Sequence, residues 1–363
     1  MKNILITSVF LMCFNTLYSQ SVYNTIDTSN IEIAKRIDFI RRYYNCETNE
    51  NAKKFWNPKL INVKHYNFGT GIEAISRNNT PKEIKKLFKL QISELEMLND
   101  SLAYVKIEVV YPEDGHILTY KYYIGGNKEQ YYLDNAISYE KSRFKQYKTH
   151  NVNFYISPFR NFSTKELNET SKSIDDLYSI LKTRKKRSVI DVYLCSNIEE
   201  MNIVANMSKY YGRQGGFSNS ESNFTAYMYQ SPKHLHEFVH VIMGGNKEQN
   251  SILEEGIASY YGGLNPNQTL SYGKTLVKNC LKNDGCKIED LMYNRKNLVL
   301  NYSVWAAICE YIIIKLGEKS LFNLFYDEDV NDKNLLDVLS NQLNTPKEMI
   351  LSDIQKMFLS GDK

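Results

Sequence analysis

The sequence predicts an α+β fold, with a small amino-terminal α+β domain before a larger domain that has a mixed sheet and a mainly helical carboxy-terminal half. Apolar and polar residues alternate over residues 102–111 and 117–124, which is typical of a hairpin with one solvent-exposed face. A strand, a helix and a strand are expected between residues 152 and 194, and the chain has mainly helical patterns from Ser231 onward.

The amino-terminal block, residues 20–145, is expected to begin with helices. Residues 31–44 are amphipathic, and Thr80 and Glu83 form a capping box around Pro81 that predicts a helix to about residue 98. A turn at residues 112–115 joins the two strands of the hairpin. Two helices that lead into a curved antiparallel sheet resemble the NTF2-like cone fold.

The second block, residues 146–363, should open with a strand at 152–156. A helix follows from the capping box of Ser163 and Glu166 to about residue 182, and a second strand covers 189–194. Residues 215–228 mix glycine, serine and β-formers, which favours a strand at the border of a cleft. The basic run 182–187 is compatible with a processing site or an acid-binding patch, but we interpret it as cations at a helix C-terminus.

Composition limits the possible classes of protein. A chain of 363 residues with 42% hydrophobic residues can bury more than one core, so two domains are expected. Its 45 basic and 41 acidic residues are mixed along the chain and leave a net charge of +4. No field of one sign follows, so neither nucleic acid nor an anionic membrane is predicted as a partner.

The amino terminus predicts export. Lys2, an apolar run over residues 4–17 and the polar end at Gln20 follow the order of a secretory signal, which we place at residues 1–19. The mature protein is then periplasmic or secreted. The apolar run is shorter than the roughly 20 residues of a spanning helix. The later candidate, residues 308–316, carries Glu310 and Lys315, so no stable membrane insertion is expected after cleavage.

Five cysteines follow the predicted signal. Export permits disulfides, and Cys280 and Cys286 are close enough in sequence to pair. An odd count leaves at least one thiol free. There is no Cys-x-x-Cys spacing, so cysteine is not expected to bind a metal. The five are Cys46, Cys195, Cys280, Cys286 and Cys309.

The strongest signal for chemistry is a pair of histidines. Ser231 as N-cap and Pro232 in the first turn predict a helix that carries His236 and His240 on one face. Two imidazoles at this spacing can bind one ion, and Glu237 can take a proton from a water that zinc acidifies to a pKa of about 7. This is the H-E-x-x-H arrangement.

The apolar residues around this pair favour a metal. Phe238, Val239 and their neighbours indicate a buried helix, where two histidines and a glutamate need partners. The alternative is two core histidines bonded to backbone groups. His234 is interpreted as a first-turn or surface histidine.

A third protein ligand is expected downstream, because catalytic zinc takes three and leaves one position for water. Glu254 and Glu255 are the candidates. Small residues at Gly256, Ala258 and Ser259 would let their helix approach the histidine helix closely.

H-E-x-x-H followed by L-x-E-G-x-A resembles the signature of gluzincin metallopeptidases, the class of thermolysin and the aminopeptidase-N-like enzymes. The resemblance covers roughly residues 193–325. It implies that His236, His240 and Glu255 bind one Zn²⁺ per chain and that Glu237 is the general base. The segment 301–307 is similar to the helix whose tyrosine faces the zinc, which implies that Tyr302 is an oxyanion donor. A packing role for this tyrosine is the alternative.

These observations predict an exported zinc-dependent metallopeptidase that acts on a peptide or protein substrate. Two alternatives stay open: an exported binding or scaffold protein with a structural metal, and a zinc hydrolase that acts on a non-peptide substrate.

Overall fold

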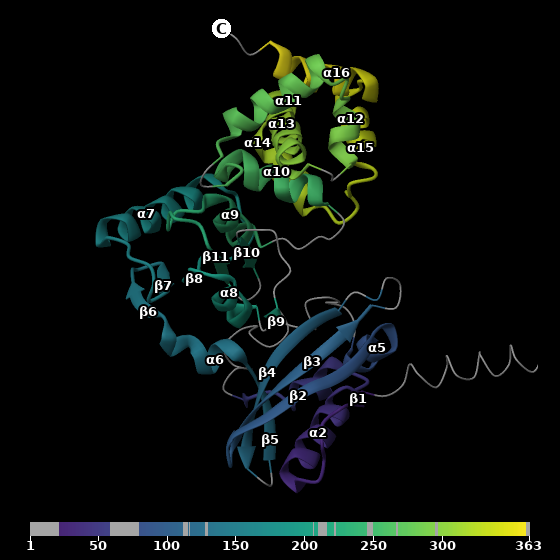
Figure 1. Cartoon of the computed structure of the whole chain (residues 1–363). Helices are drawn as coiled ribbons and strands as arrows, with labels where there is room; N and C mark the ends of the chain where they lie inside the picture. Colours follow the sequence, from purple (N-terminus) through teal and green to yellow (C-terminus); the bar gives the residue numbers. More distant parts are fainter. Residues whose placement is uncertain are drawn as a thin grey trace, which may run out of the picture. The chain divides into compact units, whose positions relative to one another are not determined.

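The protein is described by a computed structural model that covers most of the chain (Figure 1). The predicted signal at residues 1–19, the turn residues 112–114 and Gly215 lie outside the described residues. The structure describes residues 22–58, 80–111, 115, 117–127, 130–205, 207–209, 216–220, 223–244, 250–265, 268–294 and 297–360.

The fold is of the predicted mixed α+β class and divides into two compact units. Unit 1 is Met1–Lys145, Ser157–Phe159 and Cys195–Arg213, and unit 2 is Gln146–Ile156, Arg160–Leu194 and Gln214–Lys363. The segments 157–159 and 195–213, which the sequence suggested for the second block, therefore cluster with the first unit.

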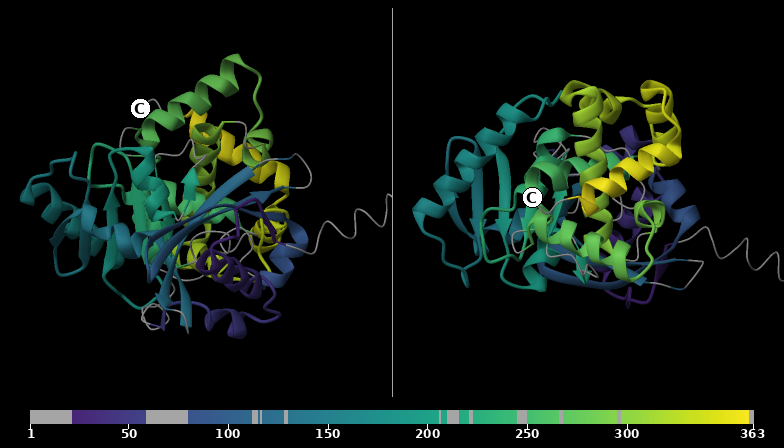
Figure 2. Two further views of the ribbon diagram at one scale, coloured as in Figure 1. Left: turned by 60° about the horizontal axis from the view of Figure 1, so that its bottom comes forward. Right: turned by 90° about the horizontal axis from the view of Figure 1, so that it is seen from above.

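Unit 1 is built on a six-stranded sheet of order β1-β2-β3-β4-β5, with β9 also paired to β4. β1 is parallel to β2, and the other pairings are antiparallel. Helix α2 crosses one face of this sheet (Figures 1 and 2). The strands are β1 (Tyr23–Asn24), β2 (Lys89–Asn99), β3 (Leu102–Val110), β4 (Ile117–Asn127), β5 (Gln130–Asn135) and β9 (Met207–Lys209), and the helices are α2 (Ile31–Tyr43), α3 (Asn49–Lys53), α5 (Pro81–Leu87), α6 (Ala136–Glu140) and α8 (Ile198–Val204).

The hairpin β3–β4 is confirmed, and its alternating pattern is the reason for its burial. Ala103, Val105, Ile107 and Val109 are fully buried or nearly so, while the residues between them are half-buried. Residues two apart on a strand face the same side, so this set lies against the core of unit 1.

The helix predicted from Thr80 to about residue 98 is wrong beyond its first two turns. The capping box of Thr80 and Glu83 is present, but α5 ends at Leu87 and β2 follows. A register shift between Ile92 and Glu94 breaks the alternation of β2, which concealed the strand in the sequence.

Unit 2 begins with a five-stranded mixed sheet of order β10-β11-β8-β7-β6. β7, α7 and β8 form the predicted strand–helix–strand unit, in which the two strands are parallel. β11 is parallel to β8, and β10 runs antiparallel to β11 at the end of the sheet. The elements are β6 (Lys145–Lys148), β7 (Val152–Ile156), α7 (Thr164–Ile180), β8 (Ile190–Leu194), β10 (Gly216–Asn219) and β11 (Phe224–Tyr227).

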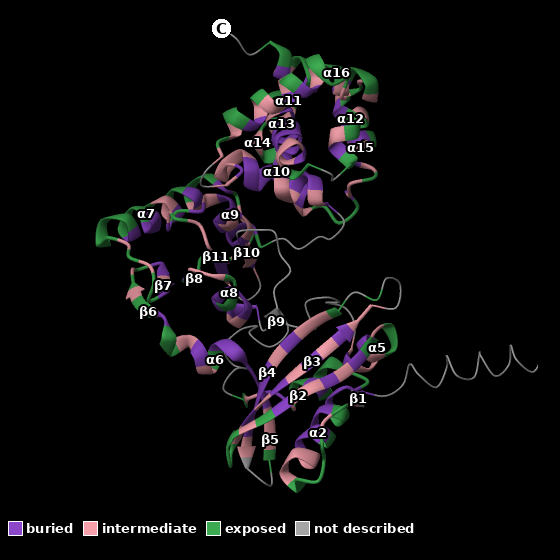
Figure 3. Cartoon of the chain, viewed as in Figure 1, coloured by how far each residue is buried: buried purple, intermediate pink, exposed green. Residues whose placement is uncertain are grey.

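The rest of unit 2 is helical, as predicted, and packs around α13 (Figure 3). The helices are α9 (Leu235–Met243), α10 (Ser251–Gly262), α11 (Leu270–Asn283), α12 (Ile288–Tyr293), α13 (Leu298–Leu316), α14 (Glu318–Tyr326), α15 (Leu335–Leu343) and α16 (Lys347–Leu359). A disulfide joins Cys280 to Cys286, and Cys46, Cys195 and Cys309 are buried.

The expectation that no later stretch is long and apolar enough to span a bilayer is wrong for α13. This helix begins at Leu298, earlier than the apolar run suggested, and by length and composition alone its 19 residues could cross a membrane. In the structure, 56% of the apolar stretch of this helix is buried inside the protein. A core helix has the same properties.

Candidate metal centre

Helix α9 carries the two predicted histidines. Their Nε2 atoms lie 3.2 Å apart, and their rings are 4.9 Å apart between centroids. The helix begins at Leu235, so the prediction that Ser231 and Pro232 start it is wrong. The hydroxyl of Tyr227 donates to the carbonyl of Pro232, and this tertiary contact holds the segment in a loop.

Helix α10 brings Glu255 to the same point. Its Oε2 lies 3.1 Å from the Nε2 of His236 and 3.4 Å from the Nε2 of His240. These three donor atoms all lie within 4.8 Å of one another. Glu254 instead places Oε1 3.7 Å from the other ring nitrogen of His240, Nδ1. Of the two candidate carboxylates, Glu255 is therefore the one that converges with both Nε2 atoms.

The tautomer of His236 follows from its second contact. Its Nδ1 lies 2.9 Å from the main-chain carbonyl of Gly263. Because a carbonyl can only accept, Nδ1 carries the proton and Nε2 presents a lone pair. A contact of this kind is the usual support of a metal-binding imidazole.

Close packing of α9 and α10 depends on a glycine that the sequence did not single out. A Cβ at Gly262 would press on the backbone nitrogen and Cα of His236. Gly256, which we expected at this contact, faces α13: a Cβ there would lie 2.7 Å from the carbonyl oxygen of Trp305 and from the Sγ of Cys309.

The C-terminal end of α9 is held by the basic loop at residues 182–187. Thr183 Oγ1 donates to the carbonyl of Ile242 at 2.7 Å, and Lys185 Nζ donates to that of Val241 at 2.9 Å. The predicted role as cations at a helix C-terminus thus holds for Lys185, but the helix is α9 rather than α7. Sequence reasoning missed this contact because the partners are far apart in the chain.

His240 and Glu255 interact electrostatically, and each shifts the pKa of the other. Burial lowers the pKa of His240, but the charge of Glu255 and its hydrogen bond outweigh burial and raise that pKa to about 10. Burial raises the pKa of Glu255, while the charge of His240 and its hydrogen bond to Glu255 hold that pKa well below its ordinary value. Without a metal ion, His240 therefore carries a proton and forms an ion pair with Glu255.

His234 lies at the start of α9 and is buried, so of the two positions expected for it, the first turn or the surface, the surface is wrong. It precedes α9 as the N-cap residue, is 3% exposed, and packs edge-on against Tyr227 and Tyr229 at 5.2 and 4.7 Å between ring centroids. Burial, together with the electrostatic effect of His236 and His240, lowers its pKa to about 3, so it is neutral. Its Nε2 lies 4.0 Å from Oε1 of Glu237.

The two predicted catalytic side chains are both at this centre. Glu237 follows His236 on α9, and its side chain is 13% exposed. Tyr302 on α13 stacks its ring on His236, with 5.6 Å between centroids and 20° between planes. The stacking confirms a packing contact for Tyr302 and places its ring beside the centre.

No protein-family model matches the chain, and no curated protein is detectably similar to it.

Proposed function

We propose that this chain is an exported zinc-dependent metallopeptidase whose ion is held by His236, His240 and Glu255. The observation that carries the proposal is the convergence of two Nε2 atoms and one carboxylate oxygen within 4.8 Å. Two imidazole nitrogens facing each other at 3.2 Å share at best one proton, whereas a cation satisfies both lone pairs and the carboxylate together.

The donor set fits zinc. Imidazole nitrogen and carboxylate oxygen are zinc ligands, and three protein ligands leave a further position for water or substrate. The side chains of His240 and Glu255 are 12% and 25% exposed, so both ligands are partly exposed to solvent. When bound, zinc supplies Lewis-acid activation of water and of the substrate carbonyl.

Glu237 is the proposed general base. It neighbours His236 on a helix whose other flanks are buried, and a carboxylate there can take a proton from water and return it to the leaving amine. Tyr302 is the proposed donor to the oxyanion, since its phenol lies on the ring that stacks on His236.

A peptide is favoured as substrate by the strand beside the histidine helix. Helix α9 packs against β10, and β10 ends the order of the sheet among the described strands. An extended peptide can add to such an edge by main-chain hydrogen bonds, and side chains on alternate residues then set specificity. A scaffold protein with a structural metal has no need of Glu237, which argues for hydrolysis.

The proposal is tested on the mature protein by two measurements. Elemental analysis after dialysis should give about one zinc per chain, in line with one three-ligand centre. Metal-loaded protein should cleave a denatured protein mixture, and Glu237→Gln should abolish cleavage while it keeps the zinc. Zinc without cleavage would favour the scaffold alternative or a non-peptide substrate, and absence of zinc would contradict the centre itself.

A further inference from the structure

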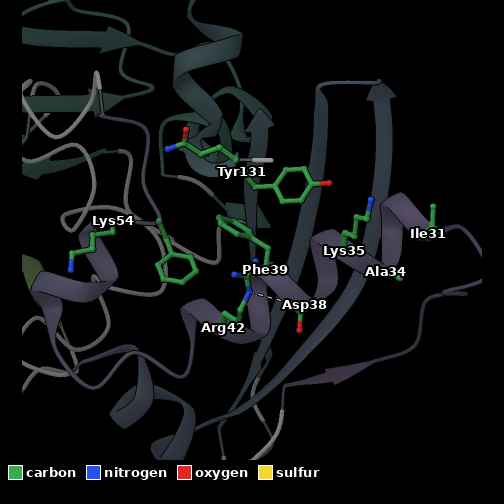
Figure 4. Close-up of a pocket in the computed structure, with 10 residues that line it drawn as sticks. Ile31, Ala34, Lys35, Asp38, Phe39, Arg42, Lys54 and Tyr131 are labelled. Carbon is green, nitrogen blue, oxygen red and sulfur yellow. Dashed lines mark ion pairs between the residues drawn. The ribbon is translucent and has the colours of Figure 1, made fainter. Parts of the chain in front are cut away.

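A groove of about 670 Å³ lies on unit 1 along helix α2 (Figure 4). One stripe of α2 forms its wall, from Ile31 to Arg42. The end of α3 and the start of β5 complete it with Lys54, Phe55 and Tyr131. All of these residues belong to unit 1, whereas the residues of the metal centre belong to unit 2.

Three aromatic rings form the floor of the groove, and the central ring, that of Phe39, contacts the other two. Phe39 is buried, and its ring lies 5.2 Å from that of Phe55 and 5.8 Å from that of Tyr131 between centroids. The other two rings are only partly buried. A side chain that enters the groove therefore meets an apolar surface already held in place by the core, which suits an aromatic or large aliphatic group.

Cations outnumber carboxylates in and beside the groove. Lys35 pairs with Glu32 at 3.1 Å, but Glu32 is shared with the buried Arg36 at 3.3 Å. Arg42 pairs with Asp38 at 3.1 Å. Lys54 donates at 3.1 Å to the neutral amide oxygen of Asn51. The groups are Lys35, Arg36, Arg42 and Lys54 against Glu32 and Asp38, so four positive minus two negative charges leave +2.

The length of the groove indicates a peptide rather than a single small acid. Ile31 and Arg42 are eleven positions apart, which is about 16 Å along a helix. Figure 4 shows Ile31 and Lys54 toward opposite ends of the lining residues, with Phe39 and Arg42 between them. An extended chain rises about 3.3 Å per residue, so about five residues span the α2 wall.

We propose that this groove binds an acidic peptide segment with one aromatic or large aliphatic anchor. The anchor lies on the floor of Phe39, Phe55 and Tyr131. Carboxylates of the segment face Lys54 and Arg42 on the rim, where charge complementarity sets which peptides are accepted. The site is a recognition surface, and it needs neither a bound metal nor hydrolysis.

The test is calorimetric titration of the full chain with capped pentapeptides. The chain carries Glu237→Gln, so that proteolysis cannot consume the probe and failure of the proposed function does not affect the result. The acidic probe is Glu-Asp-Phe-Asp-Glu. One control, Gln-Asn-Phe-Asn-Gln, removes the charge, and another, Glu-Asp-Gly-Asp-Glu, removes the anchor. We expect both controls to bind roughly tenfold more weakly than the acidic probe.

A matched pair of charge reversals locates the site. Lys54→Glu should weaken the acidic probe roughly tenfold, because it replaces an attraction on the rim with a repulsion. Lys86→Glu changes the net charge equally at an exposed position on α5 outside the groove, and it should leave the affinity within about twofold. Equal weakening by both reversals, equal binding of the uncharged peptide, or no binding at millimolar peptide would overturn the proposal.

Discussion

The side-chain amine of Lys185 donates a 2.9 Å hydrogen bond to the main-chain carbonyl of Val241, in the last turn of the histidine helix α9. The same amine also donates to the carbonyl of Ser220 and to the side-chain oxygen of Asn223. A cation at this end of a helix faces the negative end of its dipole. Lys185 thus fixes the position of α9 from the loop that precedes β8.

Replacing Lys185 with methionine should lower the free energy of unfolding by about 2 kcal/mol, because half-buried carbonyls lose a charged donor. Chemical denaturation of the mature protein measures this change. Lys186→Met is the control, since Lys186 is exposed on the same loop and its loss should change stability by less than about 0.5 kcal/mol. Equal effects of the two substitutions would contradict a specific role for Lys185.

Local sequence patterns correctly predicted the features whose contacting residues lie close together in the sequence. The two histidines are one helical turn apart, so their spacing alone places both on one face. The hairpin β3–β4 shows the same: its alternation is visible without knowledge of any partner. The choice between Glu254 and Glu255 was harder, because neighbours on a helix point about 100° apart and the direction of approach of α9 decides between them.

Contacts distant in sequence could not be predicted. Lys185 and Val241 are 56 positions apart, and no local sequence pattern indicates that they are in contact. Gly262 resembles any glycine near a helix end, although its missing Cβ is what admits the backbone of His236. The prediction of a helix where β2 lies failed for a related reason, because the register shift of β2 is determined by its pairing with β3.

Substitutions of the two adjacent glutamates should differ in their effect on zinc affinity. Glu255→Gln should weaken zinc affinity by more than about 100-fold, because it removes a charged ligand, and Glu254→Gln should weaken it by less than about tenfold, as expected for a residue beside a ligand. Competition with a chromophoric chelator measures both affinities. A larger loss in Glu254→Gln would transfer the role of third ligand to Glu254.

Tyr302→Phe distinguishes catalysis from packing. The substitution keeps the ring that stacks on His236 and removes only the hydroxyl. If the phenol donates to the oxyanion, kcat should fall roughly 100-fold while zinc content stays the same. Peptide hydrolysis under saturating substrate, with elemental analysis on the same sample, measures both quantities. An unchanged kcat would leave Tyr302 with the packing role alone.

Gly262→Ala should weaken zinc binding through the backbone of the first histidine. The added Cβ would press on the nitrogen and Cα of His236, which belong to the main chain and cannot rotate away, so α9 must shift relative to Glu255 on α10. A shift of about 1 Å is enough to misplace a metal ligand. The matched control is Gly285→Ala in the turn after α11, where the added Cβ meets no atom within 4 Å but the backbone has a φ of +66°. Conformational strain at Gly285 should cost about 1 kcal/mol of stability with zinc affinity nearly unchanged, whereas Gly262→Ala should lower the affinity at least tenfold. Chelator competition and thermal unfolding of both variants measure the two effects separately. Equal zinc affinities in the two variants would show that the close approach of α10 does not position His236.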